Sequence, residues 1–325
     1  MRLPLRYAIL SPAMNFPSIH PPNIGPGGII RIVAPGGTIE DRSSLERGIS
    51  TLERMGFRVQ YDERIFDSFR YLAGDDRARA EELMAAFEDP AVHAVMALRG
   101  GYGCSRLIPL LEEERLRHHP KPFIGFSDIT TLHLYFQKRF GWITIHGPMA
   151  ATATLGSMPY DQEQHLLSLL SDPGYLPVLQ FTQLEAWHPG TAEGRLTGGC
   201  LSIVAASIGT PYEIETDGKI LFLEDCGEPP YRIDRMVTHL RLAGKFRSVS
   251  GILLGTFLDC EPDKGEYRSA DVLRELLGEP GVPVIASFPA GHGFENWAVP
   301  LGTRVQMDAD TRSVRLLEAA VAVRT

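Results

Sequence analysis

The sequence predicts an α/β protein: an N-terminal, doubly wound, Rossmann-like parallel sheet followed by a C-terminal mixed α/β domain with more β character. From Gly28 onward, β-rich apolar runs alternate with stretches in which apolar residues recur at helical spacing. Residues 92–98 form a continuous apolar run, typical of a strand buried in a parallel sheet. The chain has 325 residues, 44% of them hydrophobic, and domains span roughly 100–200 residues, so we expect two domains.

The elements of the first half are expected in strict alternation, with glycine and proline marking their ends. They are strand 29–33, a helix through Leu45, Ile49 and Leu52 up to Gly56, strand 57–61, a helix from Asp75 to before Pro90, strand 92–98, strand 123–124, a helix from about Asp128, and strand 142–145.

The alternation stops near residue 159, where we place a domain junction. The predicted segments are a proline-rich, extended or poorly ordered arm at 1–28, the N-terminal domain at 29–158, a loop-rich linker at 159–193, and the C-terminal domain at 194–325. In the last domain we expect an apolar segment at 201–208, strands 220–223, 251–257 and 283–286, helices 232–242 and 270–277, and a hairpin over 303–317.

Composition argues against several functional classes. The formal net charge of −8 leaves no basic field for nucleic acid. The four cysteines include no C-x-x-C pair, which fits a reducing compartment. We find no convincing signal peptide, no membrane span and no zinc-binding H-E-x-x-H motif. The sequence therefore predicts a soluble cytoplasmic protein without a metal.

Ser127 lies in the turn Gly125-Phe126-Ser127-Asp128, between a short strand and a helix. It could be a nucleophile, because a helix N-terminus favours negative charge beside its oxygen. It could also cap the helix, as serine and aspartate commonly do. Ile129 breaks the G-x-S-x-G elbow, and Thr130 gives Ser127 no capping-box acid. Local sequence alone favours the cap.

A glycine-rich loop, Arg99-Gly100-Gly101-Tyr102-Gly103, follows the buried strand. Its bare amides could form an oxyanion hole or a phosphate cradle, or the glycines could serve only the turn. A dinucleotide fingerprint fails, because Arg106 stands where the third glycine would be.

Two further segments carry groups suited to catalysis. Glu224 and Asp225 come at the end of an apolar strand, where an acid can orient a histidine, cap a helix or pair with a base. His292 lies in a loop between glycines just after a strand, and histidine is the side chain best suited to move protons near neutral pH.

Taken together, these segments resemble the LD-carboxypeptidase family of serine peptidases, which includes murein tetrapeptide carboxypeptidases and microcin C self-immunity peptidases. The resemblance runs from about Ile29 to the end of the hairpin. It rests on the motifs at 32–37, 99–103, 125–128, 147–149, 223–225, 291–292 and 300–302.

The resemblance implies a Ser-His-Glu triad. Ser127 would be the nucleophile, His292 the general base and then acid, and Glu224 the residue that orients His292. The amides of Gly101 and Asp128 would form the oxyanion hole, with no metal or organic cofactor. Family members are commonly homodimers.

The sequence departs from the family at two places. Cys200 stands where relatives usually carry asparagine, which predicts altered hydrogen bonding near the substrate, and the arm before Gly28 is extra.

The implied function is removal of D-alanine from a small peptide substrate, the murein tetrapeptide, with Arg232 as a candidate for binding the anionic substrate. One alternative is a microcin C immunity-type peptidase that cleaves peptidyl or aminoacyl adenylates. Those relatives carry a longer aromatic loop near the domain junction, where this chain has only Trp187. The other is a non-catalytic module that holds an anion in the glycine loop.

Overall fold

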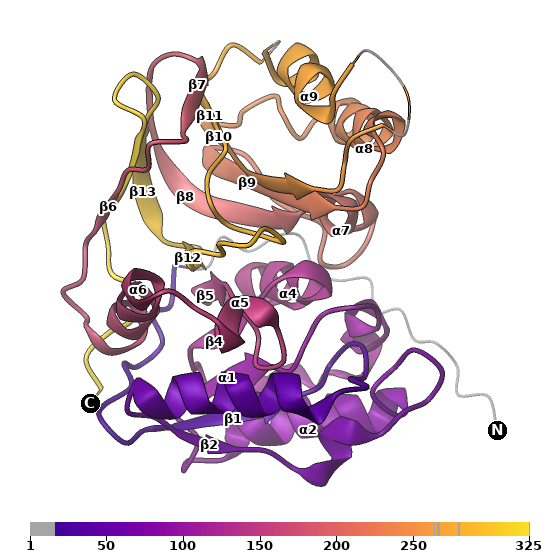
Figure 1. Cartoon of the computed structure of the whole chain (residues 1–325), viewed down its shortest axis with the longest axis vertical. Helices are drawn as coiled ribbons and strands as arrows, with labels where there is room; N and C mark the ends of the chain where they lie inside the picture. Colours follow the sequence, from indigo (N-terminus) through magenta and orange to yellow (C-terminus); the bar gives the residue numbers. More distant parts are fainter. Residues whose placement is uncertain (1–16, 263, 265–266, 279, 325) are drawn as a thin grey trace.

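The computed structural model describes residues 17–262, 264, 267–278 and 280–324. Figure 1 shows two sheets, one above the other, with the first half of the chain in indigo and magenta below and the second half in pink to yellow above. The predicted mixed α/β fold class is confirmed.

The first sheet has the strand order β12-β5-β4-β3-β1-β2. Strands β1 (Ile29–Val33), β2 (Arg58–Gln60), β3 (Ala94–Ala97), β4 (Phe123–Gly125) and β5 (Thr144–His146) are parallel, and β12 (Val299–Leu301) adds antiparallel to β5. The order reverses between β1 and β3, and ligands of open α/β sheets bind beyond the carboxyl ends of the strands at such a point. The loops after these strands meet there, where Gly37 N donates to Gly100 O at 2.8 Å.

Helices connect these strands, and their ends follow capping chemistry. Asp41 and Asp75 accept backbone N–H groups at the starts of two helices, and Gly141 ends a third in the left-handed conformation at φ 69°. The helices are α1 (Arg42–Arg54), α2 (Asp76–Glu88), α3 (Glu113–Leu116), α4 (Thr130–Phe140), α5 (Ala153–Gly156) and α6 (Tyr160–Ser171), with 3-10 turns η1 (Glu63–Phe66), η2 (Cys104–Arg106), η3 (Ile108–Leu110) and η4 (Ser127–Ile129).

The second sheet is mixed, with the order β6-β14-β13-β8-β9-β10-β11-β7. Its centre is parallel: β8 (Thr191–Cys200), β9 (Lys219–Cys226), β10 (Gly251–Leu258) and β11 (Val284–Ala286). Antiparallel strands complete it: β6 (Val178–Leu179), β7 (Glu185–His188), β13 (Arg304–Asp308) and β14 (Ser313–Leu316). The predicted C-terminal hairpin is confirmed as β13 and β14. The helices of this half are α7 (Leu201–Ala206), α8 (Pro230–Leu242) and α9 (Ser269–Gly278).

Residues 159–193 differ from the loop-rich linker that the sequence predicts. Helix α6 occupies residues 160–171 and buries Leu166, Leu169 and Leu170, a helical spacing that the surrounding polar residues obscure. β6 and β7 then form the two edges of the second sheet. This segment is therefore built into both halves of the molecule.

The predicted N-terminal arm lies partly outside the described residues. Residues 17–28, which are described, pack against the body of the protein: Ile24 is fully buried, Ile19 N donates to Gly141 O, and Asn23 N donates to Ala322 O, both at 2.8 Å. This stretch is extended, as predicted, but it is held in place by hydrogen bonds to the end of α4 and to the C-terminal segment.

Candidate active site

A cavity of about 740 Å³ lies at the carboxyl ends of the central strands of the first sheet. The residues that line it come from both halves of the chain, and they include Arg99, Gly101, Ser127, Cys226 and His292. Two of the three proposed triad side chains, Ser127 and His292, therefore line one cavity; they follow β4 and β11. Arg99 and Gly101 follow β3, and Cys226 is the last residue of β9.

Ser127 has a backbone conformation that L-residues rarely adopt, with φ at 64°. This left-handed conformation in a turn from strand to 3-10 helix is the strained geometry of a nucleophile elbow, although the glycine pattern is missing. The close approach that glycine usually permits is made from the facing loop instead. A β-carbon on Gly100 would lie 2.8 Å from Ser127 Cβ and 3.0 Å from Ser127 Oγ, so only glycine fits there.

His292 is held by a fully buried acid. Its Nδ1 lies 2.7 Å from Glu224 Oε2, its backbone N–H donates to the same oxygen at 3.1 Å, and its side chain is 15% exposed. A β-carbon on Gly291 would lie 2.3 Å from that oxygen, which explains the glycine before the histidine. The ring also contacts Phe126 edge-on, with centroids 4.9 Å apart.

The other oxygen of Glu224 faces a second histidine. His146 Nε2 lies 3.4 Å from Glu224 Oε1, and both side chains are fully buried. Burial alone would raise the pKa of Glu224, but the hydrogen bonds from His146 and His292 outweigh it and hold the pKa below its usual value. Glu224 is therefore an ionised carboxylate.

The pKa of His292 is shifted upward. Burial alone would lower this pKa, but hydrogen bonding to the Cys226 side chain and to the Glu224 carboxylate outweighs burial and raises it. Cys226 lines the same cavity, and no motif in the sequence singled it out.

Asp225 has a different task from its neighbour. Its Oδ2 accepts Ser202 N at 2.7 Å near the start of α7, and its Oδ1 accepts Cys226 N at 2.8 Å. Cys200 contacts this carboxylate with its Sγ 3.5 Å from Asp225 Oδ1, and it is not among the residues that line the cavity. Cys200 therefore lies behind the cavity wall, against Asp225, and not in the cavity where the sequence predicts an effect on hydrogen bonding to the substrate.

The two residues predicted to form the oxyanion hole are near Ser127. Asp128 follows it in the chain, and Gly101 lines the same cavity with φ at +95°. Asp128 N lies 3.4 Å from where a β-carbon on Gly100 would be. The Asp128 side chain points away and accepts Cys104 N at 2.9 Å. Burial raises the pKa of this carboxyl group.

The structure does not bring Arg232 to this cavity. Arg232 lies on the exposed face of α8, where Nη1 is 3.5 Å from Glu228 Oε2. The arginine that lines the cavity is Arg99, whose Nη1 donates to Thr38 O at 3.0 Å. In the 99–103 loop the sequence indicates a possible role only for the glycine amides, and not for the arginine that precedes them.

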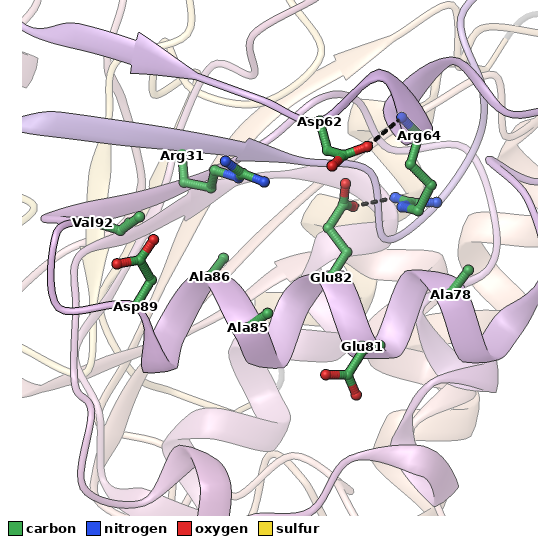
Figure 2. Close-up of a pocket in the computed structure, with 10 residues that line it drawn as sticks. All are labelled: Arg31, Asp62, Arg64, Ala78, Glu81, Glu82, Ala85, Ala86, Asp89 and Val92. Carbon is green, nitrogen blue, oxygen red and sulfur yellow. Dashed lines mark hydrogen bonds and ion pairs between the residues drawn. The ribbon is translucent and has the colours of Figure 1, made fainter.

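A second cavity, of about 410 Å³, lies between α2, Arg31 of β1, and Asp62 and Arg64 at η1 (Figure 2). Arg64 reaches across it to Glu82, as the dashed line in the figure marks. Of the described residues that line it, none is a serine, cysteine or histidine, so it does not offer the chemistry of the first cavity.

Within the described ranges, no group of three or more His, Cys, Asp or Glu side chains is arranged to hold a metal ion. The helices found in the described part of the chain are also all too short or too polar to span a membrane.

A serine in a strained turn, a histidine bonded to a buried carboxylate and a glycine loop beside them form the arrangement of a serine hydrolase. The chain belongs to the LD-carboxypeptidase family: residues 30–147 match the model of the LD-carboxypeptidase N-terminal domain and residues 193–307 that of the C-terminal domain. It is a serine-type carboxypeptidase, as the sequence predicts.

Relatives cover nearly the whole chain. A Streptomyces coelicolor relative is 40% identical over 92% of this chain and 96% of its own length. The murein tetrapeptide carboxypeptidase of Pseudomonas aeruginosa is 35% identical over 87% of this chain and 94% of its own.

Among solved structures, muramoyltetrapeptide carboxypeptidase from Oxalobacter formigenes matches with a TM-score of 0.77 and 30% identity, covering 89% of this chain and 97% of that one. The protein MccF, in complex with glutamyl sulfamoyl guanosine, matches with a TM-score of 0.87 at 23% identity over 93% and 99%. The second likeness establishes the fold alone.

Proposed function

We propose that this enzyme is a murein tetrapeptide LD-carboxypeptidase that hydrolyses the bond between the L-centre of meso-diaminopimelate and terminal D-alanine. The observation that carries the proposal is the 2.7 Å contact between His292 and Glu224 on a cavity shared with Ser127. Relatives named for this activity support the substrate class.

In the proposed first step, Ser127 Oγ attacks the scissile carbonyl carbon while His292 Nε2 takes the hydroxyl proton. The N–H groups of Gly101 and Asp128 stabilise the resulting oxyanion, and one such donor typically contributes about 3–4 kcal/mol in the transition state. The tetrahedral intermediate collapses as His292 gives its proton to the nitrogen of D-alanine. The C–N bond breaks, and free D-alanine leaves behind an acyl-enzyme on Ser127.

In the second step, water attacks the acyl-enzyme. His292 accepts a proton from this water and returns a proton to Ser127 Oγ as the ester bond breaks. The tripeptide leaves, and the resting enzyme is restored. Glu224 remains ionised throughout, holds the ring at Nδ1 and stabilises the imidazolium that forms in each step.

A carboxypeptidase must also recognise a free terminal carboxylate. Arg99 supplies a guanidinium on the cavity wall next to the proposed oxyanion loop, and guanidinium groups bind carboxylates in bidentate geometry. We assign the binding of the D-alanine carboxylate to Arg99, because Arg232 does not line the cavity.

The second candidate is a microcin C immunity-type peptidase, because MccF shares the fold of this chain with a TM-score of 0.87. Sequence identity favours the murein substrate instead, at 35% and 30% against 23%. The two candidates share the proposed triad and differ in the acyl group and in the leaving group of the substrate.

The test is to incubate the purified enzyme with murein tetrapeptide, with the same peptide ending in L-alanine, and with an aspartyl-adenylate analogue, and to follow product masses. We expect loss of D-alanine from the first peptide only, no effect of a chelator, and no turnover by Ser127→Ala. Ser287→Ala is the matched control, because Ser287 has the same φ of 63° but is not among the cavity-lining residues. Cleavage of the adenylate analogue alone would refute the murein proposal.

We further expect the enzyme to act in the cytoplasm on recycled peptides and to form a homodimer. The four cysteines are all free, in keeping with a reducing compartment. Fractionation and light scattering test these two expectations.

A further inference from the structure

We propose that His146 is a positioning residue that donates a hydrogen bond to Glu224 and so aligns the acid and base of the second half with the nucleophile of the first. The inference rests on the proposed catalytic roles of Ser127, Glu224 and His292. Nothing in the family motifs quoted above assigns a role to this histidine.

The contact is buried and specific. His146 Nε2 lies 3.4 Å from Glu224 Oε1, and both side chains are fully excluded from solvent. Aromatic rings hold the imidazole in place: the centroid of Phe222 is 5.0 Å away, edge-on, and that of Phe126 is 5.8 Å away. An ionised carboxylate without solvent needs donors at both oxygens. His292 supplies two at Oε2, from its backbone N–H and its ring, whereas His146 faces Oε1.

The surroundings of His146 determine which of its two ring nitrogens carries the hydrogen. His146 Nδ1 is buried and has no hydrogen-bond partner. A hydrogen on Nδ1 would be a buried N–H without an acceptor, so the arrangement with hydrogen on Nε2 is favoured. That tautomer is the one that can donate to Glu224.

His146 also connects the two sheets. It is the last residue of β5, where it pairs in register with Gly125 of β4, and Gly147 N donates to Gly125 O at 3.1 Å. Ser127 follows two residues after Gly125, whereas Glu224 belongs to β9 of the other sheet. The His146–Glu224 bond thus ties the strand next to the nucleophile directly to the carboxylate that holds the base.

The bond also bears on the proton affinity of His292. The charge of Glu224 is shared between the donor of His146 and the two donors of His292, so removing His146 leaves more of that charge to attract the proton of His292. Without His146 the pKa of His292 should rise, and the acid limb of kcat/KM should move to higher pH. The other titratable groups around this cluster are Cys226 and Asp225 on β9, Cys200 at the end of β8, and His133 on α4.

The test compares His146→Gln, which can present an amide N–H near the position of Nε2, with His146→Leu, which cannot donate. His165→Leu is the matched control, because His165 is also buried and hydrogen-bonded, with Nε2 2.9 Å from Ala298 O, but lies outside the site. Hydrogen bonds to charged groups are typically strong enough that losing one lowers kcat by about 10- to 100-fold.

We expect His146→Leu to lower kcat by that factor with little change in KM and to raise the acid limb of the pH profile. His146→Gln should restore most of the rate and the original limb. His165→Leu should leave the limb unchanged even if it lowers stability. Wild-type behaviour of His146→Leu, or equal loss in the Gln and Leu variants, would overturn the inference.

A second measurement needs neither turnover nor a folded Leu variant. Nitrogen NMR of histidine-labelled Ser127→Ala protein should show His146 with hydrogen on Nε2. A neutral ring with hydrogen on Nδ1 alone would refute the inference, because Nε2 could then not donate to Glu224. A failure of the proposed function would show itself differently. If Ser127→Ala or His292→Ala kept its activity, the proposed triad would be refuted, but the NMR result for His146 would still stand.

Discussion

Glu224→Gln is the substitution that most directly tests the proposed site, because it removes the charge and keeps the size. Glu224 accepts from His292 at one oxygen and faces His146 at the other. Glutamine has only one acceptor oxygen, so its NH₂ group must face one of the two histidines, and His292 also loses the charge that stabilises its protonated form.

The size of the effect follows from the contact distance. A unit charge pair about 4 Å apart interacts by roughly 4 kcal/mol at an effective dielectric of about 20, which corresponds to about 10³-fold in rate. The contact here is shorter, at 2.7 Å, and an Asp-to-Asn change at the corresponding place in a serine protease costs about 10⁴-fold. We therefore expect kcat to fall by about 10³- to 10⁴-fold. KM should change little, because Glu224 does not line the cavity.

The assay is D-alanine release from murein tetrapeptide at saturating and limiting substrate. Asp225→Asn is the control, since Asp225 is the next residue on β9 and is also buried, but its oxygens accept backbone N–H groups from Ser202 and Cys226. We expect Asp225→Asn to lower stability and to keep kcat within an order of magnitude of wild type. Near-wild-type kcat in Glu224→Gln, or equal losses in both variants, would refute the assignment of Glu224.

Three further predictions concern the cavity. Ser127→Gly should be more stable than Ser127→Ala by about 1 kcal/mol in urea unfolding, because only glycine relieves the left-handed conformation at φ 64°; equal stabilities would show that the turn is not strained. Arg99→Met should raise KM by about 10- to 100-fold for tetrapeptide but not for a substrate with an amidated C-terminus, a difference that disappears if Arg99 does not bind the carboxylate. The raised pKa of His292 means that kcat/KM should increase as pH rises above the usual histidine value, since only the neutral ring accepts a proton. Cys226→Ala removes a group that raises this pKa and should move the acid limb to lower pH; an unmoved limb would show that the thiol does not contact the ring.

The five parallel strands of the first sheet could be predicted from sequence, because they alternate with helices whose ends carry Asp and Gly signals. Its sixth strand, β12, comes from the far end of the chain and could not be predicted from this alternation. Helix α6 could not, because Pro159 and polar residues surround its three buried leucines and the segment is read as a loop. β8 was also missed. Gly198 and Gly199 reduce its strand propensity, yet a β-carbon on Gly198 would lie 1.9 Å from Phe222 O, so the close pairing with β9 requires the glycine that obscures the strand.

The candidate site shows a similar division. Ser127, Glu224 and His292 each lie in a motif near the end of a strand, but local sequence alone favours a cap for Ser127, and the triad is predicted only by the resemblance to the family. No motif points to Arg232; it is a candidate only because an anionic substrate requires a cation, and the arginine that lines the cavity is Arg99. His146 could not be found from sequence, because a buried histidine that packs in the core and one that donates to a carboxylate have the same local pattern. Only the partner across the two sheets distinguishes them.

At this site, two neighbouring residues of one motif make different contacts: one faces the proposed triad, and the next accepts backbone N–H groups. Successive side chains of a strand point to opposite faces, so Glu224 faces His146 and His292 while Asp225 faces the start of α7. In the turn after β4, Ser127 lines the cavity and Asp128 turns its carboxylate to Cys104 N. Sequence reasoning treated nucleophile and cap, or triad acid and cap, as rival roles for one residue. In the fold, one residue of each pair belongs to the proposed triad and its neighbour accepts a backbone N–H from another segment, Cys104 N for Asp128 and Ser202 N for Asp225. Neither neighbour caps the helix that follows it, so each acid holds a distant segment against the site instead of starting a local helix.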